Sequence, residues 1–255
     1  DVLAVGAPAL LIDAVVVTVT ICGGVLLGRL LKMDRGIALL TSVGSGICGA
    51  AAVLGAESTI RARPYKTAVA VSTVVIFGTI SMFLYPVLYR HGIVSLTPEQ
   101  MGIYTGATLH EVAHVVGAGN AMNGEISDAA IIVKMIRVMM LVPVLLTISY
   151  SISVARARRR RLADRRSCGG VTRRIAVPWF ALGFLAVIGF NSFGLLGEAT
   201  VSFIHSLDTF LLTMAMTALG AETSIEKFKK AGAKPFVLSL LLFVWLVGGG
   251  WLLVK

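Results

Sequence analysis

Three ionisable side chains stand within five positions of an otherwise apolar stretch of the chain. They are His110, Glu111 and His114, and the residues around them are almost all small or aliphatic. Inside a membrane an ionisable side chain costs at least about 2.5 kcal/mol, so its presence indicates a functional site. We expect His110 and Glu111 to bind or relay a proton that is coupled to the activity of the protein.

The same residues match the HExxH pattern of zinc peptidases. On a helix, two histidines four apart share a face and can hold Zn²⁺ while the glutamate activates a water molecule. A catalytic zinc needs a third protein ligand, and the spacing after Gly117 that would favour one carries Asn120. An intramembrane metalloprotease, with His110 and His114 as ligands and Glu111 as the base, is therefore the alternative. The main interpretation includes no metal and no cofactor.

Two basic residues, Lys134 and Arg137, interrupt the apolar run from Ile131 to Met140. Their spacing of three places them on one face of a helix. Near a helix end they could extend to lipid headgroups. Facing inward they could pair with Glu111 or bind an anion, for which the planar guanidinium is well suited. We expect both to contribute to substrate binding.

A stretch rich in glycine and hydroxyl groups, Thr41 to Ala50, predicts an interrupted helix. Each glycine in a helix costs about 1 kcal/mol relative to alanine, and broken helices at membrane depth are buried or line a cavity. Their free N–H groups can hold an anionic group. The other interpretation is a close helix crossing through small residues. The predicted substrate-binding residues here are Ser42, Gly44, Ser45, Gly46 and Cys48.

The composition shows what must position these residues. Of 255 residues, 56% are hydrophobic and only 14% are charged. A soluble domain has about a quarter of its residues charged, so much of this surface faces lipid. Uncharged runs cover residues 36–56, 67–89, 138–155, 175–197 and 235–254. Runs of about 20 apolar residues without strict alternation predict transmembrane helices and exclude a barrel.

The predicted architecture is an all-α, polytopic transmembrane bundle forming one domain, residues 1–255. We expect helices at 2–31, 66–90, 128–154, 175–197, 200–221 and 232–254, and interrupted segments at 36–58 and 100–121. Two weak internal matches indicate inverted repeats: helix 2–31 with helix 232–254, and Gly36-Ile37 with Gly102-Ile103. If the arginine-rich loop is cytoplasmic, the basic residues at 61–66 lie outside unless an interrupted segment is re-entrant.

The formal net charge of +10 is concentrated in one place. Nine arginines lie between Arg156 and Arg174, which predicts a cytoplasmic loop at about 155–174. Contact with anionic lipid headgroups follows from that position. No aromatic residue is interleaved there, so the segment does not indicate nucleic-acid binding. The three cysteines, Cys22, Cys48 and Cys168, show neither a disulfide framework nor a metal-binding spacing.

Several motifs together resemble the YeiH-type bacterial membrane proteins, which are commonly named sulfate exporters. They are Gly44–Ala52, Phe77–Pro86, His110–Ala113, Val133–Val138 and Ala218–Ser224. The resemblance implies an inner-membrane protein of about ten helices, with inverted repeats and crossed broken helices. Family members are longer at the N-terminus, which implies that this chain lacks leading helices. They more often carry Gln at the position of His114, which argues against an obligatory zinc ligand there.

These observations together predict a secondary transporter of a small inorganic or organic anion rather than an enzyme. Sulfate, or a related oxyanion or sulfonate, is the substrate that the resemblance implies. We expect alternating access around a site where the two interrupted segments meet, in contact with the lipid bilayer. Proton coupling, transport direction and assembly into a homo-oligomer are left open, as is a non-transporting scaffold or receptor subunit.

Overall fold

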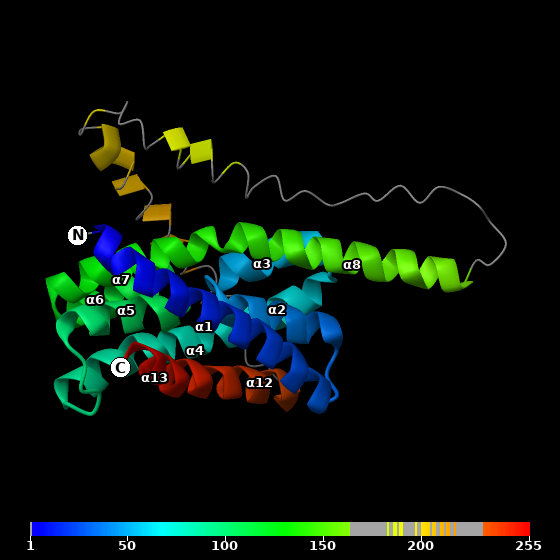
Figure 1. The fold of residues 1–255 in the computed structure, drawn as a ribbon, viewed down its shortest axis with the longest axis horizontal. Helices are drawn as coiled ribbons and strands as arrows, with labels where there is room; N and C mark the ends of the chain where they lie inside the picture. The colour runs from blue at the N-terminus through cyan, green and yellow to red at the C-terminus, as the bar shows by residue number, and fades with distance from the viewer. Residues whose placement is uncertain are drawn as a thin grey trace.

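The computed structural model describes residues 2–163 and 232–255, with isolated residues between 183 and 217. All regular elements of this part of the chain are helices (Figure 1), which confirms the all-α prediction. The elements are α1 (Val2–Leu30), α2 (Arg35–Gly46), α3 (Ala50–Ile60), α4 (Pro64–Arg90), α5 (Pro98–Thr108), α6 (Val112–Met122), α7 (Gly124–Met139), α8 (Leu141–Ala163), α12 (Ala233–Val244), the π-helix η1 (Trp245–Gly249) and α13 (Gly250–Val254). The helices predicted at 175–197 and 200–221 lie largely outside the described residues.

Four stretches of this part of the chain are long and apolar enough to cross a membrane. They are Ala9–Leu30, Pro64–Arg90, Gly124–Val154 and Ala233–Val254. Large apolar side chains such as Leu11, Phe83 and Leu252 are exposed on their outer surfaces, as expected for contact with lipid. Helix α8 continues nine residues beyond its predicted end at 154, so the arginine-rich segment is helical to Ala163. The rest of that segment, from 164, lies outside the described residues.

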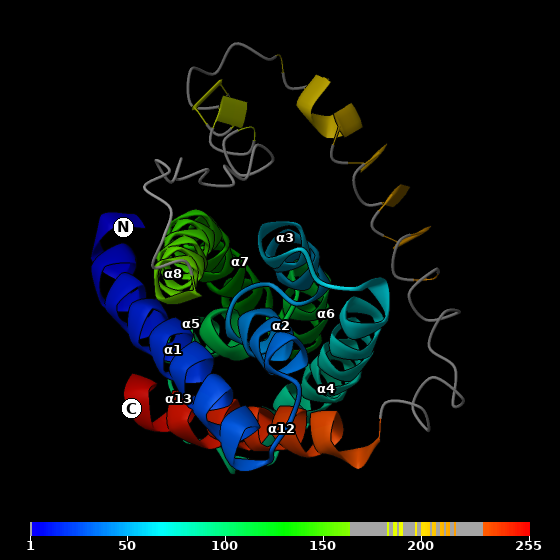
Figure 2. The same cartoon turned by 90° about the vertical axis from the view of Figure 1, so that its right-hand side faces the viewer.

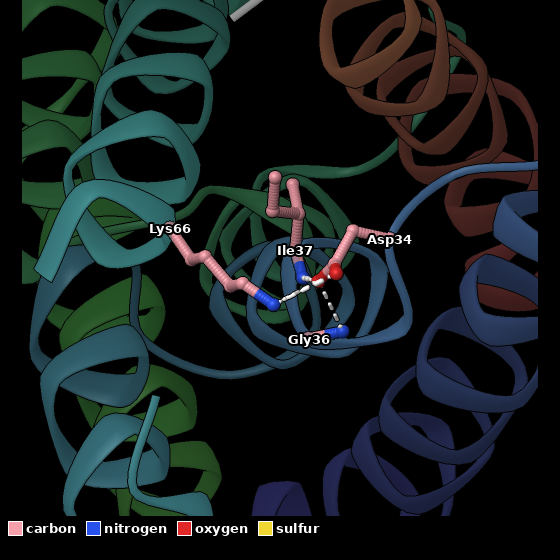
Figure 3. A network of polar contacts seen from close by, with 4 residues as sticks. All are labelled: Asp34, Gly36, Ile37 and Lys66. Carbon is pink, nitrogen blue, oxygen red and sulfur yellow. Dashed lines mark hydrogen bonds and ion pairs between the residues drawn. The ribbon is translucent and has the colours of Figure 1, made fainter. Parts of the chain in front are cut away.

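The first interrupted segment is a re-entrant hairpin, formed by α2 and α3. Asp34 caps the start of α2, and Lys66 lies in the first turn of α4, directly after α3 ends. The Lys66 Nζ lies 2.7 Å from both carboxylate oxygens of Asp34 (Figure 3). The start of α2 and the end of α3 are therefore at the same face of the bundle. An arm of 12 residues extends about 18 Å, roughly half of the membrane thickness.

The second interrupted segment, formed by α5 and α6, is also a re-entrant hairpin. Arg90 ends α4, and its Nη2 donates a hydrogen bond of 2.6 Å to the carbonyl oxygen of Ala121, near the end of α6. Helix α5 begins eight residues after Arg90, at a capping box between Thr97 and Gln100. Both ends of this hairpin therefore lie where α4 ends, opposite the face where the first hairpin begins.

Two hairpins that enter from opposite faces resolve the topology that the sequence left open. Arg29 ends α1, Arg63 lies between α3 and α4, and the Lys234 Nζ lies 3.4 Å from the carbonyl oxygen of Lys32. All of these basic groups share the face toward which α8 runs, which we call the basic face. A hairpin followed by a crossing helix occurs twice, α2–α4 and α5–α8, in opposite directions. This arrangement agrees with the inverted-repeat design expected for the two interrupted segments, while the match of helix 2–31 with helix 232–254 stays a prediction.

Small residues allow the hairpins to pack tightly between the spans. A Cβ at Gly24 of α1 would overlap the Ser42 hydroxyl of α2, and one at Gly106 of α5 would overlap the backbone of α7 at Ala130. Figure 2 shows α2 in the middle of the bundle, with α1, α4 and α12 around it. This packing holds the tip of each hairpin deep in the bundle.

Candidate functional site

The tips of the two hairpins meet inside the bundle. The α2–α3 turn is residues 47–49 and the α5–α6 turn is residues 109–111. The backbone N–H of Ala50, at the start of α3, donates a hydrogen bond of 3.1 Å to Glu111 Oε1. Gly49 has a φ of 69°, and a Cβ there would overlap the Glu111 side chain. Glycine is therefore required both by the backbone conformation and by the approach of Glu111.

One ammonium group joins the carbonyl ends of the two half-helices. The Lys134 Nζ, from α7, donates to the carbonyl oxygen of Ile47 at 2.9 Å and to that of Leu109 at 2.6 Å. These carbonyls follow the ends of α2 and α5, where a helix leaves its last carbonyl groups without partners. Lys134 thus neutralises the negative ends of two helix dipoles at once.

Arg137, one turn further along α7, also donates to carbonyl oxygens at the ends of both half-helices. Its Nε and Nη2 donate to the Gly46 carbonyl oxygen at 2.9 and 2.6 Å, and Nη2 also reaches that of Ser45 at 3.1 Å. Its Nη1 donates to the Leu109 carbonyl oxygen at 3.1 Å. Lys134 and Arg137 have no exposed surface, so both face the interior of the bundle rather than the headgroups.

Two carboxylates lie among these cations. Asp13, on α1, is fully buried, neither of its oxygens has a hydrogen-bond partner, and it interacts electrostatically with Arg137 and Lys134. Glu111 is 6% exposed, and its Oε2 has no hydrogen-bond partner. Two acidic and two basic side chains can therefore balance one another's charge within the cluster.

The two histidines of the HExxH pattern are not on one helix. His110 and Glu111 lie in the extended turn before α6, and only His114 is helical. Both ring nitrogens of the buried His110 and the Nδ1 of His114 have no hydrogen-bond partner. Across from them, α4 presents Gly78, where a Cβ would lie 2.7 Å from the His114 Cε1. Among the described residues, no three His, Cys, Asp or Glu side chains are grouped so that they could hold a metal ion.

The other predicted site residues divide into two groups. Ser42 donates its hydroxyl to the Ala38 carbonyl oxygen at 2.6 Å, and a Cβ at Gly44 would meet Val53 and Val74 side chains, so both positions serve packing. Ser45, Gly46 and Cys48 are buried at the tip, next to the groups that Arg137 and Lys134 bind. The Ser45 Oγ has no hydrogen-bond partner.

Sequence reasoning did not include Asp13, Gly49 or a tyrosine network in the predicted site. The Tyr85 and Tyr104 rings stack at 4.7 Å, and the Tyr85 hydroxyl lies 2.8 Å from the Thr108 Oγ1. The Tyr104 hydroxyl donates to the carbonyl oxygen of Val247, within η1, at 2.8 Å. An acid in the middle of an apolar helix made Asp13 a weaker candidate for an inner face of α1, but not a predicted site residue. No spacing in the sequence relates Tyr104 to Val247, 143 positions away.

Comparison with known proteins gives a consistent family. The family described as Conserved hypothetical protein 698 matches residues 1–239. A UPF0324 membrane protein of Bacteroides thetaiotaomicron is 73% identical over 255 residues, which are 100% of this chain and 74% of the relative. One from Bordetella bronchiseptica is 49% identical over 99% of this chain and 76% of its own length. The UPF0324 inner membrane protein YeiH of Escherichia coli is 45% identical over 96% of this chain and 68% of its own. No solved structure matches the chain.

Proposed function

The chain belongs to the family of Conserved hypothetical protein 698, together with the UPF0324 membrane proteins, and we propose that it is a secondary transporter of a small anion. The observation that carries this proposal is the meeting of two re-entrant hairpins, inserted from opposite faces, inside a membrane bundle. In secondary transporters of inverted-repeat design, discontinuous helices form the substrate site near the middle of the membrane. Irregular backbone at that depth is otherwise tolerated only where protein buries it.

The charges at the tips support an anion as the substrate. Helices α3 and α6 both begin at the tips, and the first N–H groups of a helix, together with its dipole, favour a negative ligand. Ser45 and His110 add buried polar groups without partners, and Lys134 and Arg137 supply positive charge behind the turns. In this proposal sulfate, or a related oxyanion or sulfonate, binds at the tips, and His110 and Glu111 carry the coupled proton.

The proposal places the protein in the bacterial inner membrane, as the printed name of the YeiH relative says of that protein. One copy of the chain supplies both hairpins, so the site needs no second copy. Transport by alternating access involves neither bond cleavage nor a cofactor. The partners are the transported anion and the surrounding lipid.

The test is the uptake of labelled sulfate into proteoliposomes that contain the full-length protein, with and without a pH gradient. We expect protein-dependent uptake that the gradient changes several-fold, and no uptake into liposomes without protein. If sulfate gives none, alkanesulfonates and carboxylates are tested in the same vesicles. Correctly folded protein that moves none of these anions would contradict the proposal.

A further inference from the structure

We propose that the carboxylate of Glu111 is a displaceable internal anion, which occupies the position at the start of α3 that the substrate's anionic group takes during transport. This inference rests on the proposed function and assigns the substrate a defined contact, the backbone N–H of Ala50. It also assigns Glu111 a role beyond carrying a proton, because the glutamate and the substrate compete for one place.

The geometry shows a site for an anion that a side chain already fills. Helix α3 has 11 residues and begins after Gly49, which has no side chain with which to cap it. Instead Glu111, from the other hairpin, accepts the Ala50 N–H at 3.1 Å. The carboxylate stands where an N-cap group or a bound anion would stand.

The contact of Glu111 with α3 is incomplete in a way that favours release. Only Oε1 has a hydrogen-bond partner, although the residue is 6% exposed and Oε2 is buried. A buried carboxylate oxygen without a partner is costly, so the docked state of Glu111 is weakly held for an ionised group at a helix start. The residue has an extended backbone outside both α5 and α6, so a change in its position would not require a helix to unwind.

The charges around Glu111 determine whether a proton must bind when the substrate replaces its carboxylate. The ionisable groups facing Glu111 are Lys134 on α7 and the Cys48 thiol in the α2–α3 turn, with His110 and His114 on its own segment. Helix α4 presents Gly78 to the histidines. An entering anion would add negative charge to a buried cluster that is already balanced, so Glu111 must bind a proton as it leaves the α3 start.

The replacement of the Glu111 carboxylate by the substrate can therefore be written as one proton-coupled step. One proton binds a carboxylate oxygen of Glu111, the neutral acid releases the Ala50 N–H, and an oxygen of the substrate accepts that N–H. One proton is taken up for each negative charge that enters. A dianion such as sulfate needs a second proton, and the fully buried Asp13, whose two oxygens lack partners, is the second carboxylate of the cluster.

The test is equilibrium binding of labelled sulfate, methanesulfonate and acetate to the purified full-length protein over a pH series. For wild-type protein we expect the Kd of a bound monoanion to fall about tenfold for each unit by which the pH is lowered, because one proton is linked to binding. Glu111→Gln mimics the protonated acid, so its Kd should not depend on pH and should be smaller than that of wild-type protein at neutral pH. The matched control is Glu125→Gln, at an exposed position, which should behave as wild-type protein.

A second variant keeps the test decisive if Glu111→Gln does not fold. Glu111→Asp retains the charge but shortens the side chain, so its carboxylate no longer reaches Ala50; we expect tighter binding at neutral pH, with the wild-type pH dependence kept because the carboxylate must still bind a proton when an anion enters. Weaker binding by the variant at every pH would show that Glu111 helps to hold the ligand, and would overturn the inference. So would a Glu111→Gln protein with the wild-type pH dependence, although the transporter proposal would stand. Wild-type protein that binds none of the three anions would overturn both.

Discussion

The hydrogen bonds of Lys134 and Arg137 go to backbone carbonyl oxygens, and this limits how either side chain can contact a ligand. Between them they donate to the carbonyl oxygens of Ser45 and Gly46, at the end of α2, and of Ile47 and Leu109, in the hairpin turns. Their charge offsets the helix ends and the buried carboxylates without a bound ligand. In the proposed transporter they would therefore act on a substrate mainly through the electrostatic potential at the tips, rather than as freely movable ligands.

The guanidinium geometry of Arg137 gives the first prediction. Arg137→Lys keeps the charge but replaces the planar fork, so at least one buried carbonyl group should lose its partner. An unsatisfied buried acceptor costs about 1–3 kcal/mol, and we expect the variant to be destabilised by about that amount. Thermal unfolding of the purified protein in detergent measures the change. An unfolding temperature equal to that of wild-type protein would show that a single ammonium can serve the same carbonyls.

The positive φ of Gly49 gives the second prediction. Gly49→Ala should cost about 1–3 kcal/mol through the backbone conformation alone, and its methyl group should also displace the Glu111 side chain. We expect a lower unfolding temperature and altered anion uptake. Gly23→Ala is the matched control, because it lies in α1 with no atom within 4 Å of the added Cβ, and it should be neutral or slightly stabilising. Equal effects of the two changes would contradict this role for Gly49.

At the scale of the elements, each hairpin is closed at its open end by a polar contact. Asp34 accepts the N–H groups of Gly36 and Ile37 at 2.8 and 3.2 Å, and it also binds Lys66 (Figure 3). The hydrogen bonds from Lys66 lower the pKa of Asp34, and the capping N–H groups lower it further. One carboxylate thus starts α2 and fastens the hairpin to α4.

Removing the charge of Asp34 gives the third prediction. Asp34→Asn can still cap α2 but loses the ion pair, which is half exposed on the Asp34 side, so the loss should be about 0.2–1 kcal/mol. Because the pKa of Asp34 is lowered on folding, its contribution is present above the unfolded value, about 3.9, and disappears as the pH falls through the folded value. Unfolding temperatures of Asp34→Asn, Lys66→Met and the double variant measure the coupling. Additive effects would show that the pair contributes nothing.

The elements also show how far the sequence could predict this structure. Glycine clusters and ionisable groups indicated both interruptions, because these residues disfavour a continuous apolar helix. The hairpin geometry was not predictable, since a broken spanning helix and a re-entrant hairpin have the same local composition. Contacts such as that between Arg90 and Ala121 decide between them, and they join distant positions. The predicted match of Gly36 with Gly102 is also out of register, because these residues lie 11 and 7 positions before the turns at 47–49 and 109–111.

The same reasoning applies to the candidate site. The spacing of Lys134 and Arg137 indicated a shared helix face, and an acid beside two histidines indicated a site near Glu111. Their partners could not be predicted, because backbone carbonyls 25 to 92 residues away leave no signal in the side-chain pattern. Ser42 shows the reverse case, in which a hydroxyl in the expected segment serves packing against Gly24.

At the scale of the whole molecule, the distribution of charge and the two hairpins define one orientation in the membrane. The basic groups near the ends of α1 and α3 and the start of α12 all lie on the basic face, toward which α8 also runs. Cytoplasmic segments of membrane proteins carry an excess of Lys and Arg, so this face should be cytoplasmic. Only four described stretches then cross the membrane, while the hairpins enter from opposite sides and stop at the tips.

This orientation gives the fourth prediction, which single-cysteine labelling of a cysteine-free full-length protein can test. Arg63→Cys and Lys234→Cys should react with a membrane-impermeant maleimide in inverted vesicles, because both positions are exposed on the basic face. Glu99→Cys and Asn123→Cys, at the two ends of the second hairpin, should react only in right-side-out vesicles. If α2 and α3 crossed the membrane as one broken helix, Arg63→Cys and Lys234→Cys would react from opposite sides. If α5 and α6 crossed the membrane as one broken helix, Glu99→Cys and Asn123→Cys would react from opposite sides. Labelling of each pair from one side would show that both hairpins are re-entrant. The hairpin tips, with Glu111, would then be accessible only from within the bundle, which is the arrangement that alternating access around them requires.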